Sequence, residues 1–378
     1  MISVANPASV TKAGPVASLF AVCSATNGRV LSCRGVRRGL LGVLILWLTA
    51  SLAGCGENRS SEAAASAFSG EIMGTVYHVK VVPGDDDLPG DLGQRIFDVL
   101  SDVDQRMSTY KPDSELNQLN RAEVGKAIPV SAPLLDVLTL SRKVYRESGG
   151  AFDPTVAPLV NLWGFGPDFH EDSIPAESAI AQLLAEVGYN HLDIDQEQAA
   201  VRKDRALSLD LSAVAKGYAV DQVAALLDTL DIANYMVEVG GEMAMLGHND
   251  RGQPWQIAIE KPQASSRSVQ QIVAIEEGAI ATSGDYRNYF EKEGVRFSHT
   301  IDPRTGYPIS HSLASVTVIA DNCGYADALA TAFMVMGAER ALALAEERNI
   351  AVFTLSKTQD GFTAAHSSAF EPYLKETP

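Results

Sequence analysis

The sequence predicts an α+β fold with a largely antiparallel sheet. Short segments of alternating apolar residues follow one another closely, which is typical of strands joined by hairpins, and amphipathic helical segments are mixed among them. At 378 residues the chain can form one large domain or two lobes. A chain of this length buries roughly 70–75% of its unfolded surface, so its stability does not require disulfides. We find no internal repeat.

The elements follow from local patterns. Alternation predicts strands at 71–82, 207–211, 235–239, 243–246, 255–260 and 271–276, then at 314–320 and, as the final strand, 350–355. Helical spacing predicts helices at 92–103, 134–145, 174–187, 218–230 and 326–347. Gly149 and Gly150 end the second helix, and Gly337 divides the last one. Polar loops are expected at 151–155, 162–166 and 281–306.

Composition and charge indicate a globular protein and limit the kinds of partner it can bind. The chain is 46% hydrophobic and 20% charged, which is ordinary for a globular protein. Its formal charge is −17, but residues 1–54 hold five basic residues and no acid. The remainder has 25 basic and 47 acidic residues, a charge of −22. So acidic a domain is a poor partner for nucleic acid, although a nucleotide can still occupy a local site.

The N-terminal segment resembles an export signal. Arg34, Arg37 and Arg38 precede an apolar run at 40–48, and Leu52-Ala-Gly-Cys55 follows it. This ending resembles a bacterial lipobox, which predicts a lipid on Cys55 after cleavage and a place on the periplasmic face of a bacterial membrane, inner or outer. The alternative is an uncleaved anchor, but the run is shorter than the roughly 20 apolar residues of a membrane span.

This interpretation predicts three parts of the chain: a signal peptide with lipobox at 1–54, a flexible tether rich in Ser, Ala and Glu at 55–69, and a folded domain at 70–378. Cys23 and Cys33 lie in the removed segment, and Cys55 is acylated. Only Cys323 remains, so no intrachain disulfide or cysteine-based metal site can form.

Asp327 and Thr331 are candidate metal ligands. They lie four residues apart on a predicted helix, so their oxygens share one face. A carboxylate and a hydroxyl at this spacing suit Mg²⁺, which completes its shell with substrate phosphate. The alternative is a solvated aspartate near a helix N-terminus.

The segment from Asp210 to Gly217 joins a predicted strand to a predicted helix. Its small residues allow a ligand close to the backbone, helix N-terminal amides attract anions, and Lys216 can neutralise a phosphate. A tight turn with a surface lysine is the alternative. A Walker loop and a Gly-x-Gly-x-x-Gly motif are both absent, so neither of those nucleotide sites is supported.

His299 is a candidate general base. It lies in the polar segment 281–306, whose hydroxyls, arginines, aspartates and glycines suit a phosphate site. An unperturbed histidine pKa of about 6.5 suits proton transfer near neutral pH. A structural histidine bonded within its loop is the alternative. The other histidines show no metal-ligand spacing.

Two aromatic residues, Tyr110 and Phe152, are candidates to stack on a planar ligand, although aromatic residues more often belong to the core. The neighbouring Asp153-Pro154 can equally be only a turn.

Taken together, these segments resemble the ApbE family of FAD:protein FMN transferases. The motifs occur in order over 73 to about 337 and, as a set, are specific to that family: Met73-Gly-Thr75, Met107-Ser-Thr-Tyr110 with Ser114-Glu115, Gly150-Ala-Phe-Asp-Pro-Thr155, Leu162-Trp-Gly-Phe-Gly166, Asp210-Leu-Ser-Ala-Val-Ala-Lys-Gly217, Val239-Gly-Gly241, Ala281-Thr-Ser-Gly-Asp-Tyr286, His299-Thr-Ile-Asp-Pro-Arg-Thr-Gly306 and Ala326-Asp-Ala-Leu-Ala-Thr331.

The resemblance implies an ApbE-type, T-fold-like α+β domain with FAD in a cleft between two lobes. It implies that FAD is held by Met73, Tyr110, Ala151, Phe152, Asp153, Asp210, Lys216, His299 and Ile301. It also implies a metal held by Asp327, Thr331 and the backbone carbonyl of Ala213.

The implied reaction is the metal-dependent transfer of FMN from FAD to a Thr or Ser hydroxyl of another protein, with His299 as base and AMP as the other product. The implied acceptor is an exported or membrane redox subunit, and the metal is Mg²⁺ or Mn²⁺. Two alternatives remain open: hydrolysis of FAD to FMN and AMP, and an exported lipoprotein that binds FAD without catalysis.

Overall fold

The computed structural model describes residues 65–84, 87–166, 173–263, 268–285, 288–292 and 294–375. The chain separates into two units, 1–60 and 61–378, and all described residues belong to the second. The predicted signal peptide and Cys55 therefore lie outside the described residues. Within these ranges, no helix combines the length and apolarity that crossing a bilayer requires.

An eight-stranded sheet forms the centre of this unit. Its strands lie in the order β1 (Ser66–Ile72), β2 (Thr75–Val81), β6 (Tyr235–Val239), β7 (Glu242–Leu246), β10 (Glu277–Gly284), β13 (Leu313–Ala320), β14 (Ala351–Thr358) and β15 (Gly361–His366). Each neighbouring pair is antiparallel. The predicted α+β class with a largely antiparallel sheet is confirmed.

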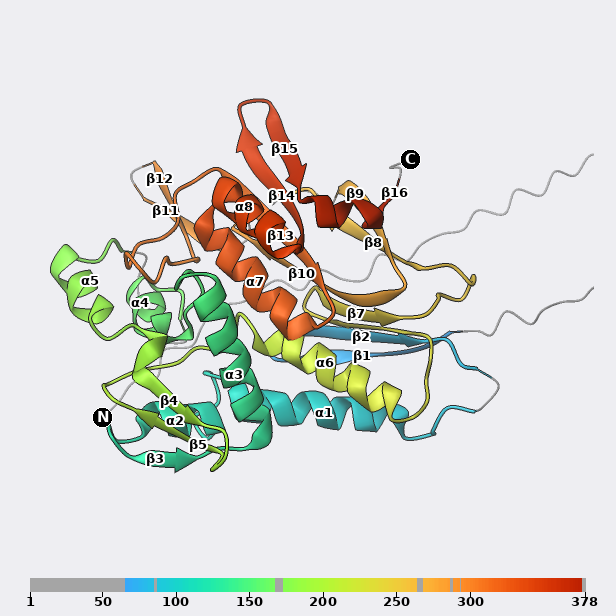
Figure 1. Cartoon of the computed structure of the whole chain (residues 1–378), viewed down its shortest axis with the longest axis horizontal. Coiled ribbons are helices and arrows are strands. Elements are labelled where there is room, and N and C mark those ends of the chain that lie inside the picture. Colours follow the sequence, from blue (N-terminus) through green and yellow to red (C-terminus); the bar gives the residue numbers. More distant parts are fainter. Residues whose placement is uncertain are drawn as a thin grey trace, which may run out of the picture. The chain divides into compact units, whose positions relative to one another are not determined.

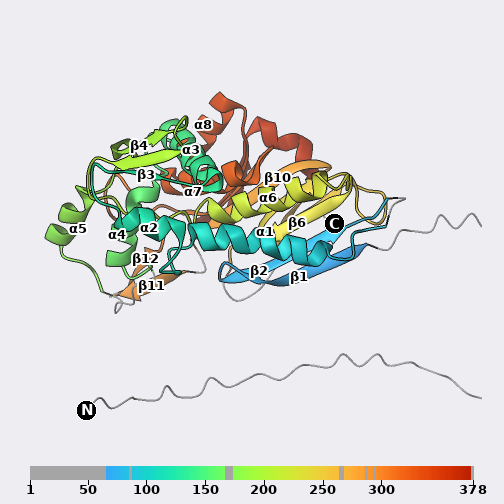
Figure 2. The ribbon, with the colours of Figure 1, turned by 90° about the horizontal axis from the view of Figure 1, so that it is seen from below.

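Helices cover one face of this sheet (Figure 1). At its centre, α6 (Ala215–Asp228) packs on β6 and β7, and α7 (Cys323–Met336) packs on β10 and β13. Beside them, α1 (Leu92–Met107) packs against α6, as Figure 2 shows from below, and against β1, and α8 (Ala338–Arg348) packs against α7 and β14. The helix α3 (Ala132–Glu147) packs against α7 and α1. Because α7 has neighbours on both sides, most of its residues are buried, and it is apolar almost all round.

A three-stranded sheet contributes to the apolar core on the opposite face. It consists of β8 (Trp255–Glu260), β9 (Val269–Ile275) and β16 (Leu374–Lys375), and it is joined by the short helix η3 (Ser368–Tyr373). Their apolar side chains form one cluster with Ile280, Ile319 and Phe353 of the central sheet. The central sheet is therefore buried on both faces at β10, β13 and β14.

A second small sheet lies beside α3. It contains β3 (Ala127–Pro129), β5 (Ala200–Lys203) and β4 (Leu192–Asp195), and α2 (Glu115–Arg121) precedes it in the chain.

A separate apolar cluster joins segments far apart in the sequence. It draws on α4 (Ala157–Leu162), α5 (Glu177–Leu184) and the hairpin β11 (Tyr289–Lys292) and β12 (Val295–Ser298). Trp163 is almost fully buried in this cluster, and its indole N–H donates to the carbonyl of Gly306 at 2.9 Å. Two short helices, η1 (Pro154–Val156) and η2 (Tyr189–His191), complete the elements.

The helices α6 and α7 approach each other closely near their N-termini. A Cβ on Gly217 would lie 2.4 Å from the carbonyl oxygen of Cys323, so only glycine fits there. Asp221, one turn further along α6, accepts hydrogen bonds from the backbone N–H of Cys323 at 2.7 Å and of Gly324 at 2.8 Å. Burial raises the pKa of Asp221 to about 6 although these bonds favour its charged form. The two helix starts are thus fixed against each other.

Several predicted elements are wrong in extent. The strand predicted at 71–82 is a hairpin of β1 and β2, which turns at Met73 and Gly74 with φ of 52° and 72°. Since β1 begins at Ser66, the last residues of the predicted tether belong to the sheet. The segment 151–155 is not entirely a loop, because η1 begins at Pro154. The strand at 350–355 is not the last one, because β15 and β16 follow.

Two further predictions, at 207–211 and 281–306, are wrong in the type of element. The segment 207–211 is not a strand, although Leu207, Leu209 and Leu211 are buried as alternation predicts. The side chain of Asn120 bonds both the N–H and the carbonyl of Leu209, at 2.8 and 3.0 Å, in place of a neighbouring strand. The segment 281–306 is not a polar loop throughout, because it contains the end of β10 and the hairpin β11–β12.

Candidate functional site

A cavity of about 450 Å³ brings together the segments that the sequence analysis singled out. The loop after α1, the 151–154 turn, the 210–216 segment, the end of β10, the 299–303 segment and α7 all contribute to its wall. Polar groups from segments more than 200 residues apart thus face one hollow, which is the arrangement expected of a ligand site.

Most predicted site residues line this cavity: Tyr110, Ala151, Phe152, Asp153, Asp210, Ala213, Lys216, His299, Ile301, Asp327 and Thr331. Met73 is not among the lining residues; it lies at the β1–β2 turn. Cys55 lies outside the described residues. The placement brings the predicted residues together, and their individual ligand roles stay predictions.

The two candidate metal ligands lie on α7 as predicted. Asp327 is 3% exposed, and Asn322 rather than Asp327 caps the helix, so Asp327 is not a solvated aspartate. Its Oδ2 accepts hydrogen bonds from the N–H of Gly217 at 3.1 Å and from Nζ of Lys216 at 3.4 Å. The hydroxyl of Thr331 lies 3.1 Å from that of Ser283 on β10.

The oxygen atoms around α7 fit a hard cation that takes only a few of its ligands from the protein. In the described part of the chain, no group of three or more His, Cys, Asp or Glu side chains is placed to hold a metal. One carboxylate, one hydroxyl and a nearby carbonyl are nevertheless typical of Mg²⁺, which keeps waters and takes substrate phosphate oxygens as its other ligands.

Lys216 lies between carboxylates. Its Nζ is 3.4 Å from Asp327 and 3.7 Å from Glu242, and it donates to the carbonyl of Ser212 at 3.0 Å. Burial by itself lowers the pKa of Lys216, but the two carboxylates outweigh burial and raise the pKa above its ordinary value. The lysine is therefore a positive charge on the cavity wall near neutral pH.

The ring of His299 is held in one orientation. Its Nδ1 lies 2.9 Å from the carbonyl oxygen of Asn288, and its ring meets that of Phe165 edge-on, with centroids 6.3 Å apart. A carbonyl only accepts, so Nδ1 carries the proton and Nε2 of the neutral ring keeps its lone pair. Burial lowers the pKa of His299, which favours this neutral form.

Two of the predicted flavin ligands also fix their own loops. Asp153 accepts hydrogen bonds from the N–H and hydroxyl of Thr155, at 2.8 and 2.6 Å, and from the N–H of Tyr189 at 3.1 Å. Asp210 accepts from the N–H of Ser212 at 2.8 Å. The turn-forming role that the sequence left open for Asp153 is therefore present.

The two aromatic candidates differ in exposure. Phe152 is 3% exposed and belongs to the main apolar core, whereas Tyr110 is 70% exposed at the cavity. Asn117 donates to the carbonyls of Thr109 and Lys111, at 2.9 and 3.0 Å, and so fixes the loop that carries Tyr110. Tyr110 is the better placed of the two to stack on a planar ligand.

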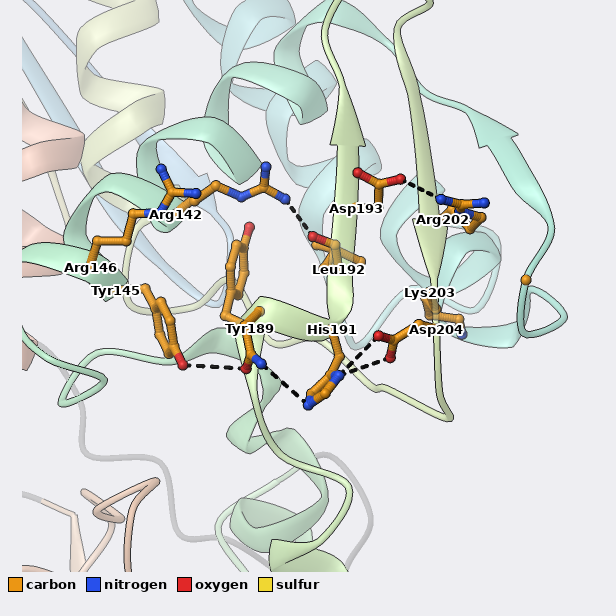
Figure 3. A pocket seen from close by; sticks show the side chains of 12 residues that line it. Arg142, Tyr145, Arg146, Tyr189, His191, Leu192, Asp193, Arg202, Lys203 and Asp204 are labelled. Atoms are coloured by element: carbon orange, nitrogen blue, oxygen red, sulfur yellow. Dashed lines mark hydrogen bonds and ion pairs between the residues drawn. The ribbon is translucent and has the colours of Figure 1, made fainter.

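A larger hollow of about 690 Å³ lies between α3 and the β4–β5 hairpin (Figure 3). Its charged side chains largely pair with one another: Arg202 with Asp193 at 2.8 Å, and His191 with Asp204 at 2.9 Å. Arg142 donates to the carbonyl of Leu192. Because none of the predicted site residues lines this hollow, size alone does not identify the functional site.

Sequence reasoning missed Glu242 and Ser283 of the cavity wall and Asp221 behind it. Glu242 directly follows the Gly240-Gly241 pair, and Ser283 belongs to the motif at 281–286. Each residue therefore lies beside or within a sequence pattern that predicts the site. Asp221 lies inside a helix with no local pattern around it, and only the packing of α6 on α7 reveals it.

Comparisons with known proteins identify a family of similar sequences. The model of the ApbE family matches residues 73–354. A FAD:protein FMN transferase of Haemophilus influenzae is 41% identical over 90% of this chain and 99% of its own length. One of Vibrio cholerae is 46% identical over 82% of this chain and 92% of its own length.

Solved structures are similar in fold. The flavin transferase ApbE from Vibrio cholerae superposes with a TM-score of 0.77 at 44% identity, covering 82% of this chain and all of that chain. The flavinyl transferase ApbE from Pseudomonas stutzeri gives a TM-score of 0.76 at 39% identity, over 82% of this chain and 96% of its own.

Proposed function

The chain belongs to the ApbE family, and we propose that it is a FAD:protein FMN transferase. In this reaction a hydroxyl oxygen of an acceptor protein bonds to the phosphorus on the FMN side of FAD. The bond from that phosphorus to the AMP oxygen breaks, and AMP leaves with the electron pair. The products are a phosphoester-linked flavoprotein and AMP.

The observation that carries this proposal is the meeting of His299, Lys216 and the Asp327–Thr331 pair around one cavity. A protein that only binds FAD needs no neutral imidazole in the same cavity as a cluster of phosphate-binding and cation-binding groups. Phosphoryl transfer needs these groups, because its catalysis rests on positioning and on offsetting charge.

Each group has a role in the proposed reaction. Tyr110 stacks on FAD, and the 151–153 turn and Asp210 hold it. Nε2 of His299 accepts the proton of the attacking hydroxyl. The ammonium of Lys216 and the amides at the start of α6 stabilise negative charge on the pyrophosphate and on the leaving AMP.

Asp327, Thr331 and the carbonyl of Ala213 would hold Mg²⁺ or Mn²⁺. Such a cation supplies positive charge beside the pyrophosphate, which lowers the cost of the charge that develops on AMP.

The acceptor is proposed to be an exported or membrane redox subunit with a flavinylation Thr or Ser. This agrees with the predicted lipobox, which places the enzyme outside the cytoplasm as a lipoprotein attached through Cys55.

The direct test is a mass spectrum of the acceptor. The purified domain is mixed with FAD, Mg²⁺ and an acceptor, with the same acceptor lacking its target hydroxyl (Thr→Ala) as control. We expect a covalent FMN adduct on the intact acceptor only, with one AMP for each adduct. Free FMN and AMP without an adduct would instead identify a FAD pyrophosphatase, and unchanged FAD would exclude both enzymes.

Asp327→Ala should abolish Mg²⁺ binding and lower FMN transfer by about a hundredfold or more, since a bound metal supplies several kcal/mol of charge stabilisation. Asp321→Ala is the matched control, because Asp321 is exposed just before α7 and lies outside the cavity. Mg²⁺ binding is measured by calorimetry, and urea unfolding verifies the fold. Unchanged activity with a folded Asp327→Ala variant would show that the metal assignment is wrong.

The pH dependence follows from His299. Its pKa in the folded protein lies below the ordinary value of 6.5, so it is neutral above that pH and takes up a proton as the pH falls further. We therefore expect kcat/KM to be level near pH 7 and to fall only in acid, and His299→Asn to lose about 10²–10⁴-fold in rate. A pH–rate profile with its acid limb above pH 7 would contradict His299 as the base.

Lipidation is tested by the intact mass of the mature protein extracted from membranes. We expect a chain that begins at Cys55 and carries lipid, and a soluble, unlipidated product from Cys55→Ser. An unlipidated wild-type protein would exclude the lipoprotein proposal without affecting the proposed reaction.

A further inference from the structure

Glu242 is a buried carboxylate of the cavity wall for which the reaction outlined above has no role. It is the first residue of β7, is 4% exposed, and lies immediately after Gly240 and Gly241. Its Oε1 is 3.7 Å from Nζ of Lys216. Its Oε2 is buried and has no hydrogen-bond partner among the described residues. An unsatisfied carboxylate oxygen is costly in a protein interior, so its presence at a ligand cavity calls for a functional reason.

The reason lies in the surroundings of Lys216. Its ammonium is within 4 Å of two carboxylates, Asp327 at 3.4 Å and Glu242 at 3.7 Å. Both carboxyl groups are almost fully buried. Burial raises the pKa of Glu242 to about 8 against the attraction of Lys216, so Glu242 is largely ionised only above that pH. In that range the two carboxylates and Lys216 together carry one more negative charge than positive. In the absence of a cation, the ammonium is nearer to Asp327, the residue proposed to hold the cation.

A cation on Asp327 and the ammonium of Lys216 repel each other at this distance, and the repulsion is strong where water is scarce. Lys216 then needs another anionic partner, and Glu242 is the second carboxylate with which it forms an ion pair. Without Glu242, Lys216 either remains on Asp327 and competes with the cation, or it moves into solvent and away from the pyrophosphate.

We propose that Glu242 is a positioning residue that holds the ammonium of Lys216 beside the cavity while Asp327 binds the divalent cation. This inference rests on the proposed metal-dependent function. In this arrangement Asp327 binds the cation and Glu242 pairs with the lysine. Two positive charges can then lie beside one pyrophosphate.

The test measures Mg²⁺ binding to the FAD-free domain by calorimetry at about pH 9, above the pKa of about 8 of Glu242, so that Glu242 is ionised. Glu242→Gln keeps the shape of the side chain and removes its charge, so Lys216 pairs with Asp327 alone. We expect the affinity for Mg²⁺ to fall about tenfold, which corresponds to about 1.4 kcal/mol.

A double-mutant cycle distinguishes positioning from simple loss of negative charge. If Glu242 acts through Lys216, then adding Glu242→Gln to a Lys216→Met variant should change the Mg²⁺ affinity less than about twofold. An undiminished tenfold loss in that background would overturn the proposal, because it would show that Glu242 acts on the cation directly. Urea unfolding verifies each variant, and Lys216→Gln replaces Lys216→Met if the latter does not fold.

Glu238→Gln is the matched control. Glu238 lies on the other side of the glycine pair, at the end of β6, where it bonds His78 at 2.6 Å and the N–H of Gly241 at 2.7 Å. It has no ion pair with Lys216, so its loss should leave Mg²⁺ affinity within about twofold. An equal loss from Glu238→Gln would overturn the proposal.

This experiment involves neither FAD nor an acceptor, so its outcome is separate from that of the transfer assay. Normal Mg²⁺ affinity in Glu242→Gln, together with FMN transfer by the wild-type domain, would reject the role of Glu242 and retain the function. A wild-type domain that binds no Mg²⁺ would reject both this role and the metal site.

Discussion

The close crossing of α6 and α7 is the constraint on which the rest of the site depends. Gly217 allows the two helix starts to approach, and Asp221 fixes them by accepting from two backbone N–H groups of α7. The residues before this crossing supply Ala213 and Lys216, and those after it supply Asp327 and Thr331. Because both helices pack on the central sheet through an apolar core, the distance between these groups is set by buried packing and not by a loop. Phosphate-binding and cation-binding groups are thus held together before any ligand arrives, which is the preorganisation that phosphoryl transfer requires.

The part of the cavity wall that carries His299 is stabilised in a different way. His299 follows β12, and its ring lies against Phe165, which stacks on Phe290 of β11 with centroids 5.6 Å apart. The Trp163–Gly306 hydrogen bond ties the segment after His299 to the same cluster. The proposed base therefore rests on a small aromatic core of its own, while the charged groups rest on the main core. A substitution in either core should disturb one wall more than the other.

The sequence predicts the features of this arrangement that depend on residues close together in the chain, and it does not predict those that depend on contacts between distant segments. The helical spacing of Asp327 and Thr331 predicts their shared face, and alternation predicts most strands of the central sheet, because each pattern reports the burial of its own segment. The segment 207–211 shows the limit: its alternation predicts burial correctly, but Asn120 from far away in the chain takes the place of a strand neighbour. Asp221 and Glu242 show the same limit at the site, since their roles depend on partners in α7 and α6 that no window of sequence contains.

The charges at the site also explain why so acidic a domain can accept a pyrophosphate. The chain after residue 54 carries a formal charge of −22, which by itself repels an anion. Long-range repulsion between exposed charges is screened beyond about 8–10 Å at physiological salt, whereas a buried ammonium acts on its neighbours with little screening. Lys216 is a partly buried ammonium of this kind, and its two carboxylates raise its pKa above the ordinary value, so it is positively charged near neutral pH. The local positive charge therefore outweighs the distant negative charge at the place where the phosphates bind. The acidic surface then affects mainly which acceptor proteins can approach, and it disfavours those that are themselves strongly acidic.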